Sequence, residues 1–368
     1  MGKPPDRNVR TRPEEGQRAA YFQIREEKRM EPDPQVMKLV SLAVLILQTT
    51  ALVLTLRYSR TVASDGPRYL SSSAVFSSEV LKFLSCLVII FFEARLSLRR
   101  MMMTLHEEVF AKSGETLKVG IPALCYVVQN NLLFFALSKL DAATYQVTYQ
   151  LKILTTALFS VSMLGRRING LKWIALVMLM TGVALVQMPA KEGASEDSKH
   201  GWADSLMGVG AVLAACFSSG FSGVYFEKIL KGTKTSLFIR NLQLAFFSIF
   251  GSLLMVALYD WDAAVKDGLF QGYNNLVFAV VALQAYGGLI IALVVKYADN
   301  ILKGFGVSLS IILSSIMSYF LLGDFQPSWL FVVGAGLVIG STFLYGYTPP
   351  ATARKATTFT AKPSIKTF

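Results

Sequence analysis

The chain has 368 residues, of which 53% are hydrophobic and only 16% charged, against about 25% charged in an average soluble domain. This deficit of charge excludes an ordinary cytosolic enzyme. The net charge of +12 does not predict nucleic-acid binding either, because the Lys and Arg residues are scattered between apolar blocks and do not form one basic face.

Residues 1–36 mix both charges with several prolines and contain no apolar core, so we expect a disordered tail. Ten apolar stretches follow, each long enough to cross a bilayer as a helix. They cover residues 38–57, 70–92, 117–138, 141–164, 170–188, 204–229, 236–259, 274–295, 299–322 and 327–346. Strands are excluded because an open sheet edge would leave backbone groups unsatisfied in hydrocarbon. The predicted fold class is an all-α membrane protein with ten transmembrane helices.

Lys and Arg are concentrated in the connectors that lie on the same side as the two termini. By the positive-inside rule this side is the cytosol, so both termini are predicted to be cytosolic. The chain then divides into a tail at 1–36, a first unit at 37–188, a lumenal linker at 189–203, a second unit at 204–347 and a cytosolic tail at 348–368.

An offset of 158 residues relates the fourth and fifth spans to the ninth and tenth, aligning Asp141 with Asp299 and Gly182 with Gly340. Five spans separate the equivalent positions. Because this number is odd, the second copy would cross the membrane upside down. We therefore predict two inverted five-helix repeats, with a substrate site between them near the middle of the membrane.

Three lysines fall inside the apolar spans, where each costs roughly 2.5 to 3.5 kcal/mol unless it meets a partner or a wet cavity. Lys82 follows Glu79 by three residues, so a helical ion pair and a ligand role are equal alternatives. Lys303 follows Asp299 by four residues, which allows a local pair. Glycines at 304 and 306 favour instead a close approach of a ligand or a neighbouring backbone.

Lys152, the third of these lysines, lies near the middle of its span, and no carboxylate is one turn away on its own helix. Its counter-ion is either a carboxylate from another helix, with Glu79 the main candidate, or an anionic substrate, which we favour. Amides and tyrosines gather at 126–131 and 145–150. Such side chains read base edges and sugar hydroxyls and offer stacking faces, whereas ordinary interhelical hydrogen bonding would explain only one or two of them.

The sequence lacks the residue patterns that ATP hydrolysis, metal binding and catalysis require. No Gly-x-x-x-x-Gly-Lys-Ser/Thr loop is present, so ATP-driven pumping is not predicted. The two histidines, His106 and His200, both lie in polar connectors and suggest no metal site, and no catalytic His or Cys arrangement accompanies Glu79. We therefore predict no enzyme activity, no cofactor and no metal.

Residues 141–158, DAATYQVTYQLKILTTAL, resemble the fourth-helix signature of the Golgi nucleotide-sugar transporters. The segments at 129–131, 223–228 and 295–305 resemble further motifs of that family in the same order. This resemblance implies the drug/metabolite transporter fold and an exchange of cytosolic nucleotide sugar for lumenal nucleoside monophosphate. Three segments are most similar to the branch for UDP-N-acetylglucosamine, with the UDP-galactose branch close behind; they are 272–274, 318–320 and 342–347.

The resemblance also implies substrate-binding residues. Lysines would hold the phosphates, amides, tyrosines and a threonine would surround the nucleoside, and an acid with a lysine would lie near the sugar. These residues are Lys152 and Lys303; Tyr126, Gln129, Asn130, Tyr145, Thr148 and Asn241; and Glu79 and Lys82.

Partners implied by the resemblance are a UDP-sugar, UMP and the lipid of the Golgi membrane, without nucleic acid. UDP-galactose and UDP-N-acetylgalactosamine stay open as alternative substrates. A non-transporting membrane scaffold for glycosyltransferases is the alternative from another class of protein, and a homodimer is left open.

Overall fold

The structure is a computed structural model that describes residues 34–61, 69–137, 139–140, 142–188, 202–321 and 328–347. Over these residues the regular structure is helical and includes no strand. Ten segments are long and apolar enough to cross a membrane, and all ten overlap the predicted spans. The predicted class, an all-α membrane protein with ten spanning helices, is confirmed.

Eleven helices make up the ten spans, because the fourth span is broken in two. They are α2 (Pro34–Thr61), α3 (Ser71–Glu93), α5 (Ser113–Leu137), α6 (Ala142–Tyr149) with α7 (Lys152–Leu164), α8 (Gly170–Gln187), α9 (Trp202–Gly232), α10 (Leu237–Tyr259), α12 (Asn275–Tyr297), α13 (Asn300–Leu321) and α14 (Trp329–Gly346). Helix α2 begins at Pro34, two residues before the predicted end of the tail, and the boundary of that tail stays a prediction. Proline suits the first turn of a helix, where its missing N–H has no partner to lose.

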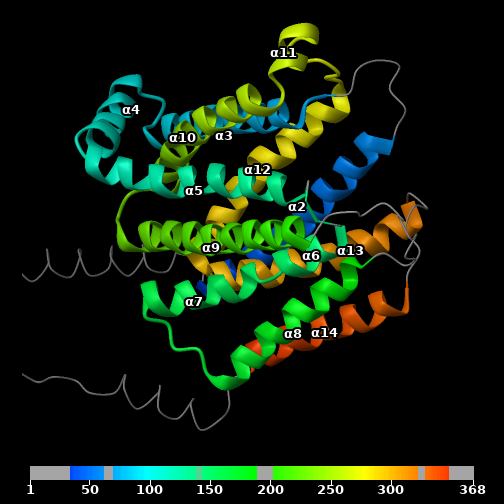
Figure 1. The fold of residues 1–368 in the computed structure, drawn as a ribbon. Helices are drawn as coiled ribbons and strands as arrows, with labels where there is room; N and C mark the ends of the chain where they lie inside the picture. Colours follow the sequence, from blue (N-terminus) through cyan, green and yellow to red (C-terminus); the bar gives the residue numbers. More distant parts are fainter. Residues whose placement is uncertain are drawn as a thin grey trace, which may run out of the picture.

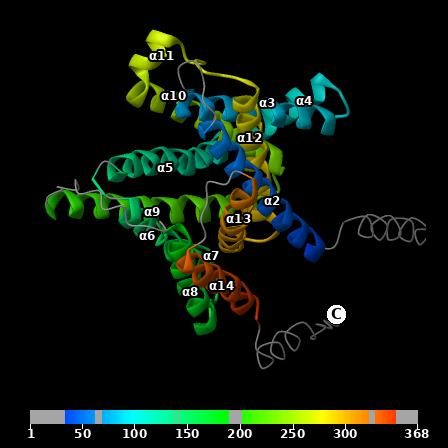
Figure 2. The same cartoon turned by 90° about the vertical axis from the view of Figure 1, so that its right-hand side faces the viewer.

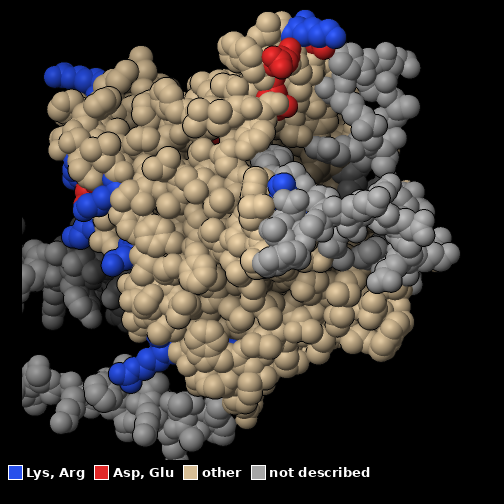
Figure 3. All heavy atoms as spheres, viewed as in Figure 1, with Lys and Arg blue, Asp and Glu red and all other residues tan. Residues whose placement is uncertain are grey.

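Two connectors contain helical structure that the sequence did not predict. Helix α4 (Leu98–Leu105) and the π-helix η1 (His106–Phe110) follow α3, and α11 (Trp261–Asp267) follows α10. They lie at opposite ends of the bundle (Figure 1). We call the end with α4, where α2 begins and α14 ends, the terminal side, and the end with α11 the distal side. Between the two ends the face seen in Figure 3 is largely free of charged side chains.

Helices far apart in the sequence lie side by side (Figures 1 and 2). Helix α8 packs on α14, α3 on α10, α5 on α9 and α2 on α12. If the two halves of the chain are equivalent, each span corresponds to the span five places later, so that α2 corresponds to α9 and α5 to α12. The pairs α8–α14 and α3–α10 then each join corresponding spans, and the pair α2–α12 corresponds to the pair α9–α5. This pairing is what inverted five-helix repeats require. The symmetry itself, and the unit boundaries with it, stay predictions.

Helices α8 and α14 approach each other through glycine. A Cβ atom added to Gly182 would lie 2.9 Å from the Gly334 carbonyl oxygen, and one added to Gly334 would lie 2.7 Å from the Gly182 carbonyl oxygen. Small residues allow such backbone contact between membrane helices. Gly336, two residues further along α14, has no atom within 4 Å of its added Cβ.

This contrast gives a stability prediction. Gly334→Ala is expected to lower the free energy of unfolding by about 1 to 3 kcal/mol, because the methyl group forces two backbones apart. Gly336→Ala, the control on the same helix, is expected to be neutral or to raise it by up to about 1 kcal/mol through helix propensity. Thermal unfolding of the purified protein in detergent checks both. Equal midpoints for the two variants would contradict the close contact.

Candidate functional site

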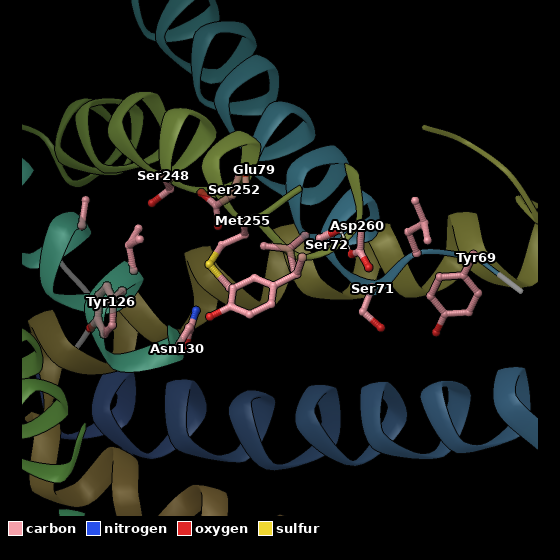
Figure 4. Close-up of a pocket in the computed structure, with 16 residues that line it drawn as sticks. Tyr69, Ser71, Ser72, Glu79, Tyr126, Asn130, Ser248, Ser252, Met255 and Asp260 are labelled. Atoms are coloured by element: carbon pink, nitrogen blue, oxygen red, sulfur yellow. Dashed lines mark hydrogen bonds between the residues drawn. The ribbon is translucent and has the colours of Figure 1, made fainter. Parts of the chain in front are cut away.

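A cavity of about 720 Å³ lies between α3, α5 and α10 (Figure 4). It extends from the distal ends of α3 and α10 to the middle of α5, and no connector of the terminal side lines it. Its walls are apolar with a few polar groups, and its volume is within the roughly 300 to 1,000 Å³ of small-molecule sites. The principal polar lining residues are Ser71, Ser72, Glu79, Tyr126, Asn130, Ser248, Ser252 and Asp260.

Three of the predicted substrate-binding residues, Glu79, Tyr126 and Asn130, line this cavity. Figure 4 places Tyr126 and Asn130 on one wall, opposite Ser248 and Ser252. Of the serines at the start of α3, Ser71 and Ser72 line the cavity, whereas Ser73 and Ser77 contact the Tyr273 hydroxyl. At the distal mouth, the Ser72 hydroxyl donates to the Asp260 carboxylate and so links α3 to the end of α10.

The local ion pair that the sequence allowed between Glu79 and Lys82 is present. Lys82 Nζ lies 2.6 Å from Glu79 Oε2 and 2.8 Å from Oε1. Lys82 is buried, while Glu79 keeps contact with the cavity. Each charge is thus balanced by its neighbour one helical turn away, which leaves Glu79 without an ion pair to Lys152.

Lys152 lies at a break in the fourth span, which the sequence analysis predicted as one continuous helix over 141–164. Helix α6 ends at Tyr149 and α7 begins at Lys152. In between, the Gln150 N–H donates to the Val147 carbonyl at 3.2 Å and the Leu151 N–H to the Thr148 carbonyl at 3.1 Å, as in a tighter 3₁₀ turn. Broken helices of this kind surround the binding sites of many membrane carriers.

The ammonium group of Lys152 lies 4.0 Å from the centre of the Tyr149 ring. Among the described residues, no carboxylate is within ion-pair distance of it, and Glu79, its main predicted partner on another helix, is taken by Lys82. Gln129 donates from Nε2 to the Tyr149 hydroxyl at 3.3 Å. A chain of contacts therefore runs from Gln129, beside the cavity residue Asn130, to Lys152.

Lys303 does not form the local pair with Asp299 that its spacing allowed. Asp299 Oδ2 accepts from Arg166 Nη1 at 2.6 Å, and Oδ1 accepts from the Leu302 N–H at 2.7 Å. An added Cβ on Gly306 would lie 3.2 Å from Leu45 of α2, so this glycine allows close helix packing, whereas Gly304 faces open space. Lys303 forms no ion pair with any described carboxylate.

Lys152, Lys303 and the remaining predicted residues are not among the residues that line the cavity. Tyr145 stacks on Tyr149 with ring centres 6.1 Å apart, and the Thr148 carbonyl accepts from the Cys216 thiol at 3.8 Å. Asn241 is buried and donates to the Leu237 carbonyl of its own helix at 2.9 Å. The structure thus gathers Tyr145 and Thr148 near Lys152 and gives Asn241 a contact within α10.

An ion-pair cluster on the terminal side was missed by the sequence analysis. Arg166, between α7 and α8, donates from Nη2 to Glu227 Oε1 of α9 at 2.5 Å as well as to Asp299. Lys231 Nζ also lies 2.8 Å from Glu227 Oε1, and the Glu227 side chain is fully buried. We call Arg166, Glu227, Lys231 and Asp299 the terminal cluster. The partners are far apart in sequence, so no local spacing could reveal it.

Ten membrane-spanning helices, a cavity that reaches mid-bundle from one side and an ion-pair cluster on the other define a multi-pass membrane protein with an internal cavity of small-molecule size. The sequence model of the nucleotide-sugar transporter family matches residues 33–346, and the chain belongs to this family. The resemblance found in the sequence is confirmed, and the family is one of transporters, not of enzymes.

Curated relatives are similar along nearly their whole length. The chain is 59% identical over 326 residues to the UDP-N-acetylglucosamine/UDP-N-acetylgalactosamine transporter nstp-4 of Caenorhabditis elegans, covering 87% of this chain and 96% of that protein. It is 60% identical over 315 residues to the human UDP-N-acetylglucosamine transporter, covering 85% and 96%. The UDP-galactose translocator of Bos taurus is 47% identical over 331 residues, covering 89% and 82%.

A solved crystal structure also matches this fold, with a TM-score of 0.58 and 17% sequence identity. The match covers 86% of this chain and 97% of the other. At this identity the likeness concerns the fold alone.

Proposed function

We propose that the protein exchanges cytosolic UDP-N-acetylglucosamine for lumenal UMP across the Golgi membrane. The observation that carries this proposal is the position of Lys152, a cation at a break in a membrane span, outside the residues that line the cavity and without a carboxylate partner among the described residues. An intramembrane lysine of this kind calls for an anionic ligand. Relatives about 59% identical are UDP-N-acetylglucosamine transporters, which supports the choice of sugar.

In this proposal Lys152 and Lys303, one from each half of the chain, hold the phosphates that a UDP-sugar and UMP share. The ring of Tyr149 supports the Lys152 ammonium through a cation–π contact when no phosphate is bound. The nucleoside lies among aromatic and amide side chains, and the sugar lies towards the Glu79–Lys82 pair. The nucleoside residues are Tyr126, Gln129, Asn130, Tyr145, Thr148 and Asn241.

Obligatory exchange follows from the same two lysines. In a site of low dielectric, two facing ammonium groups repel each other more strongly than in water. A phosphate-bearing ligand removes this repulsion, so the loaded carrier changes its orientation more readily than the empty one. The nucleotide that leaves must therefore be replaced before the site can return.

We assign the terminal side to the cytosol and the distal side to the Golgi lumen, in agreement with the distribution of Lys and Arg in the connectors. The cavity reaches the distal side, and the terminal cluster joins the α7–α8 connector, α9 and the α12–α13 connector. The described conformation then corresponds to a lumen-facing carrier whose cytosolic side is held closed by ion pairs.

Counterflow in liposomes tests this function. Uptake of labelled UDP-N-acetylglucosamine is expected to be fast into vesicles preloaded with UMP and to remain at background in vesicles without nucleotide. UDP-galactose, the matched competitor, is expected to be taken up roughly tenfold more slowly, as is typical of discrimination by a single pocket contact. Equal uptake with and without UMP would contradict exchange, and faster uptake of UDP-galactose would contradict the assigned sugar.

UDP-N-acetylgalactosamine is the second candidate substrate, because a relative 59% identical to this chain is named for both N-acetylated sugars. The two sugars share the acetamido group and differ in the orientation of one hydroxyl. Including UDP-N-acetylgalactosamine in the same counterflow series separates a carrier for one sugar from a carrier for both.

A further inference from the structure

Helix α4 is attached to the end of α3 by a sharp reversal of the chain. Arg95 and Leu96 both adopt positive φ angles, 55° and 57°, a region that residues with side chains rarely occupy. The Leu96 N–H donates to the Phe91 carbonyl at 3.0 Å, and Ser97 then caps α4 by accepting from the Arg100 N–H at 3.5 Å. This turn fixes the direction in which α4 leaves the membrane helix.

One side of α4 is held by the bundle. Met101 is buried in an apolar cluster with Ile90 of α3 and Leu242 of α10, and Leu105 packs against the same cluster. Helix α4 is therefore anchored at the terminal side and does not extend freely into solvent (Figure 1).

Other apolar side chains of α4 are exposed and are not covered by any described residue. Leu98 and Met102, four residues apart and therefore on one helix face, are 64% and 61% exposed. Exposed apolar residues also follow one face of α3, at Leu84, Val88 and Phe92, which are spaced by four. Because α3 spans the membrane, this row meets lipid, and α4 follows four residues after the end of that span.

The same short segment is basic. Arg95, Arg99 and Arg100 are exposed and form no ion pair with any described carboxylate, and Glu93 is the one acidic residue between positions 93 and 105. Apolar side chains at a membrane surface flanked by arginines are typical of helices that lie on anionic leaflets.

We propose that α4 is an interfacial helix that binds the anionic headgroups of the leaflet on the terminal side. Leu98 and Met102 enter the boundary of the acyl chains, while Arg95, Arg99 and Arg100 contact lipid phosphates. The ligand is the lipid surface, recognised by negative charge next to hydrocarbon, and not the transported nucleotide. The proposal requires only that α3 crosses the membrane, so it does not depend on the proposed function.

Hydrogen exchange of the purified full-length protein in nanodiscs tests this proposal. One set of discs contains only phosphatidylcholine, and the other contains phosphatidylcholine and phosphatidylserine in a ratio of about 7 to 3. Backbone amides of residues 98–105 are expected to exchange roughly 30-fold more slowly in the anionic discs, as expected from about two arginines at a charged surface. Arg99→Gln with Arg100→Gln is expected to remove this difference.

Two further variants complete the experiment. Arg99→Lys with Arg100→Lys keeps both charges and is expected to retain the protection, which separates a charge effect from misfolding. Lys266→Gln, on α11 at the distal side, is the control and is expected to exchange like the unaltered protein. Equal exchange in both kinds of disc would overturn the proposal, as would loss of the difference in Lys266→Gln.

Discussion

Lys152→Ala is expected to slow the exchange of UDP-N-acetylglucosamine for UMP by roughly 30-fold to several-thousand-fold. Removing one partner of a buried, hydrogen-bonded charge pair costs about 2 to 5 kcal/mol, and we propose that the phosphates of both substrates are such partners. Lys303, the second lysine proposed to hold the phosphates, lies on α13 and is kept in this variant, so exchange is slowed and not abolished. The initial rate of counterflow in UMP-loaded liposomes measures the effect.

The control for this prediction is Lys172→Ala. Lys172 also lies over a tyrosine ring, with its ammonium 5.1 Å from the centre of Tyr345, but it belongs to the first turn of α8 near the terminal side. Its removal is expected to leave the exchange rate unchanged. A normal rate in Lys152→Ala would reject the phosphate role. If transport were lost while cells expressing the variant kept normal lumenal glycosylation, the scaffold alternative would be supported instead.

Arg166→Ala is expected to open the terminal side of the carrier. The substitution leaves the fully buried Glu227 with Lys231 as its one remaining ion-pair partner among the described residues, and breaking a buried pair costs about 3 to 5 kcal/mol. If the terminal cluster holds this side closed, its loss shifts the population towards the cytosol-facing state by roughly 100-fold or more.

Labelling of a cysteine at position 304 measures this shift. Gly304 is next to Lys303 and has open space around it, so Gly304→Cys adds a thiol without a clash. A membrane-impermeant maleimide applied from the cytosolic side is expected to react much faster when Arg166→Ala is also present. The three native cysteines are free, and Cys86 and Cys216 are buried, so protein without the added cysteine gives the background.

Arg167→Ala is the matched control for Arg166→Ala, since Arg167 is adjacent and exposed and pairs with no carboxylate in the described part of the chain. Equal labelling in the two variants would show that the terminal cluster does not close this side. A double variant, Arg166→Gln with Glu227→Gln, removes the buried Glu227 carboxylate together with its arginine partner. It is expected to label fast while unfolding at nearly the normal temperature, which separates opening from general instability.

Hydropathy alone predicted the ten spans, because a helix in hydrocarbon needs about 20 apolar residues whatever its neighbours are. The Glu79–Lys82 pair could be predicted for a similar reason, since its partners are one turn apart. The break before Lys152 could not, because no glycine or proline marks Gln150 or Leu151. The pairing of Arg166 with Asp299 could not be predicted either, because the two residues are 133 positions apart and meet only after the helices pack.

Some of the residues that line the cavity could be predicted from the sequence, and others could not. Glu79, Tyr126 and Asn130 stood out as polar groups in apolar spans and do line the cavity. Ser248, Ser252 and Asp260 were not predicted, because serine and a connector aspartate are ordinary at these positions. Their part in the cavity is set by the packing of α10 against α3 and α5.

The interruption between α6 and α7 divides one span into two parts that both contact Cys216 of α9. Thr155 of α7 donates to the Cys216 carbonyl at 2.8 Å, and the Thr148 and Tyr149 carbonyls of α6 accept from the Cys216 thiol at 3.8 and 3.5 Å. The ring of Tyr149 also lies 4.0 Å from the Lys152 ammonium. Under the proposed function, a ligand that moves Tyr149 or Thr148 would therefore also displace Lys152, which would couple recognition of the base to the hold on phosphate.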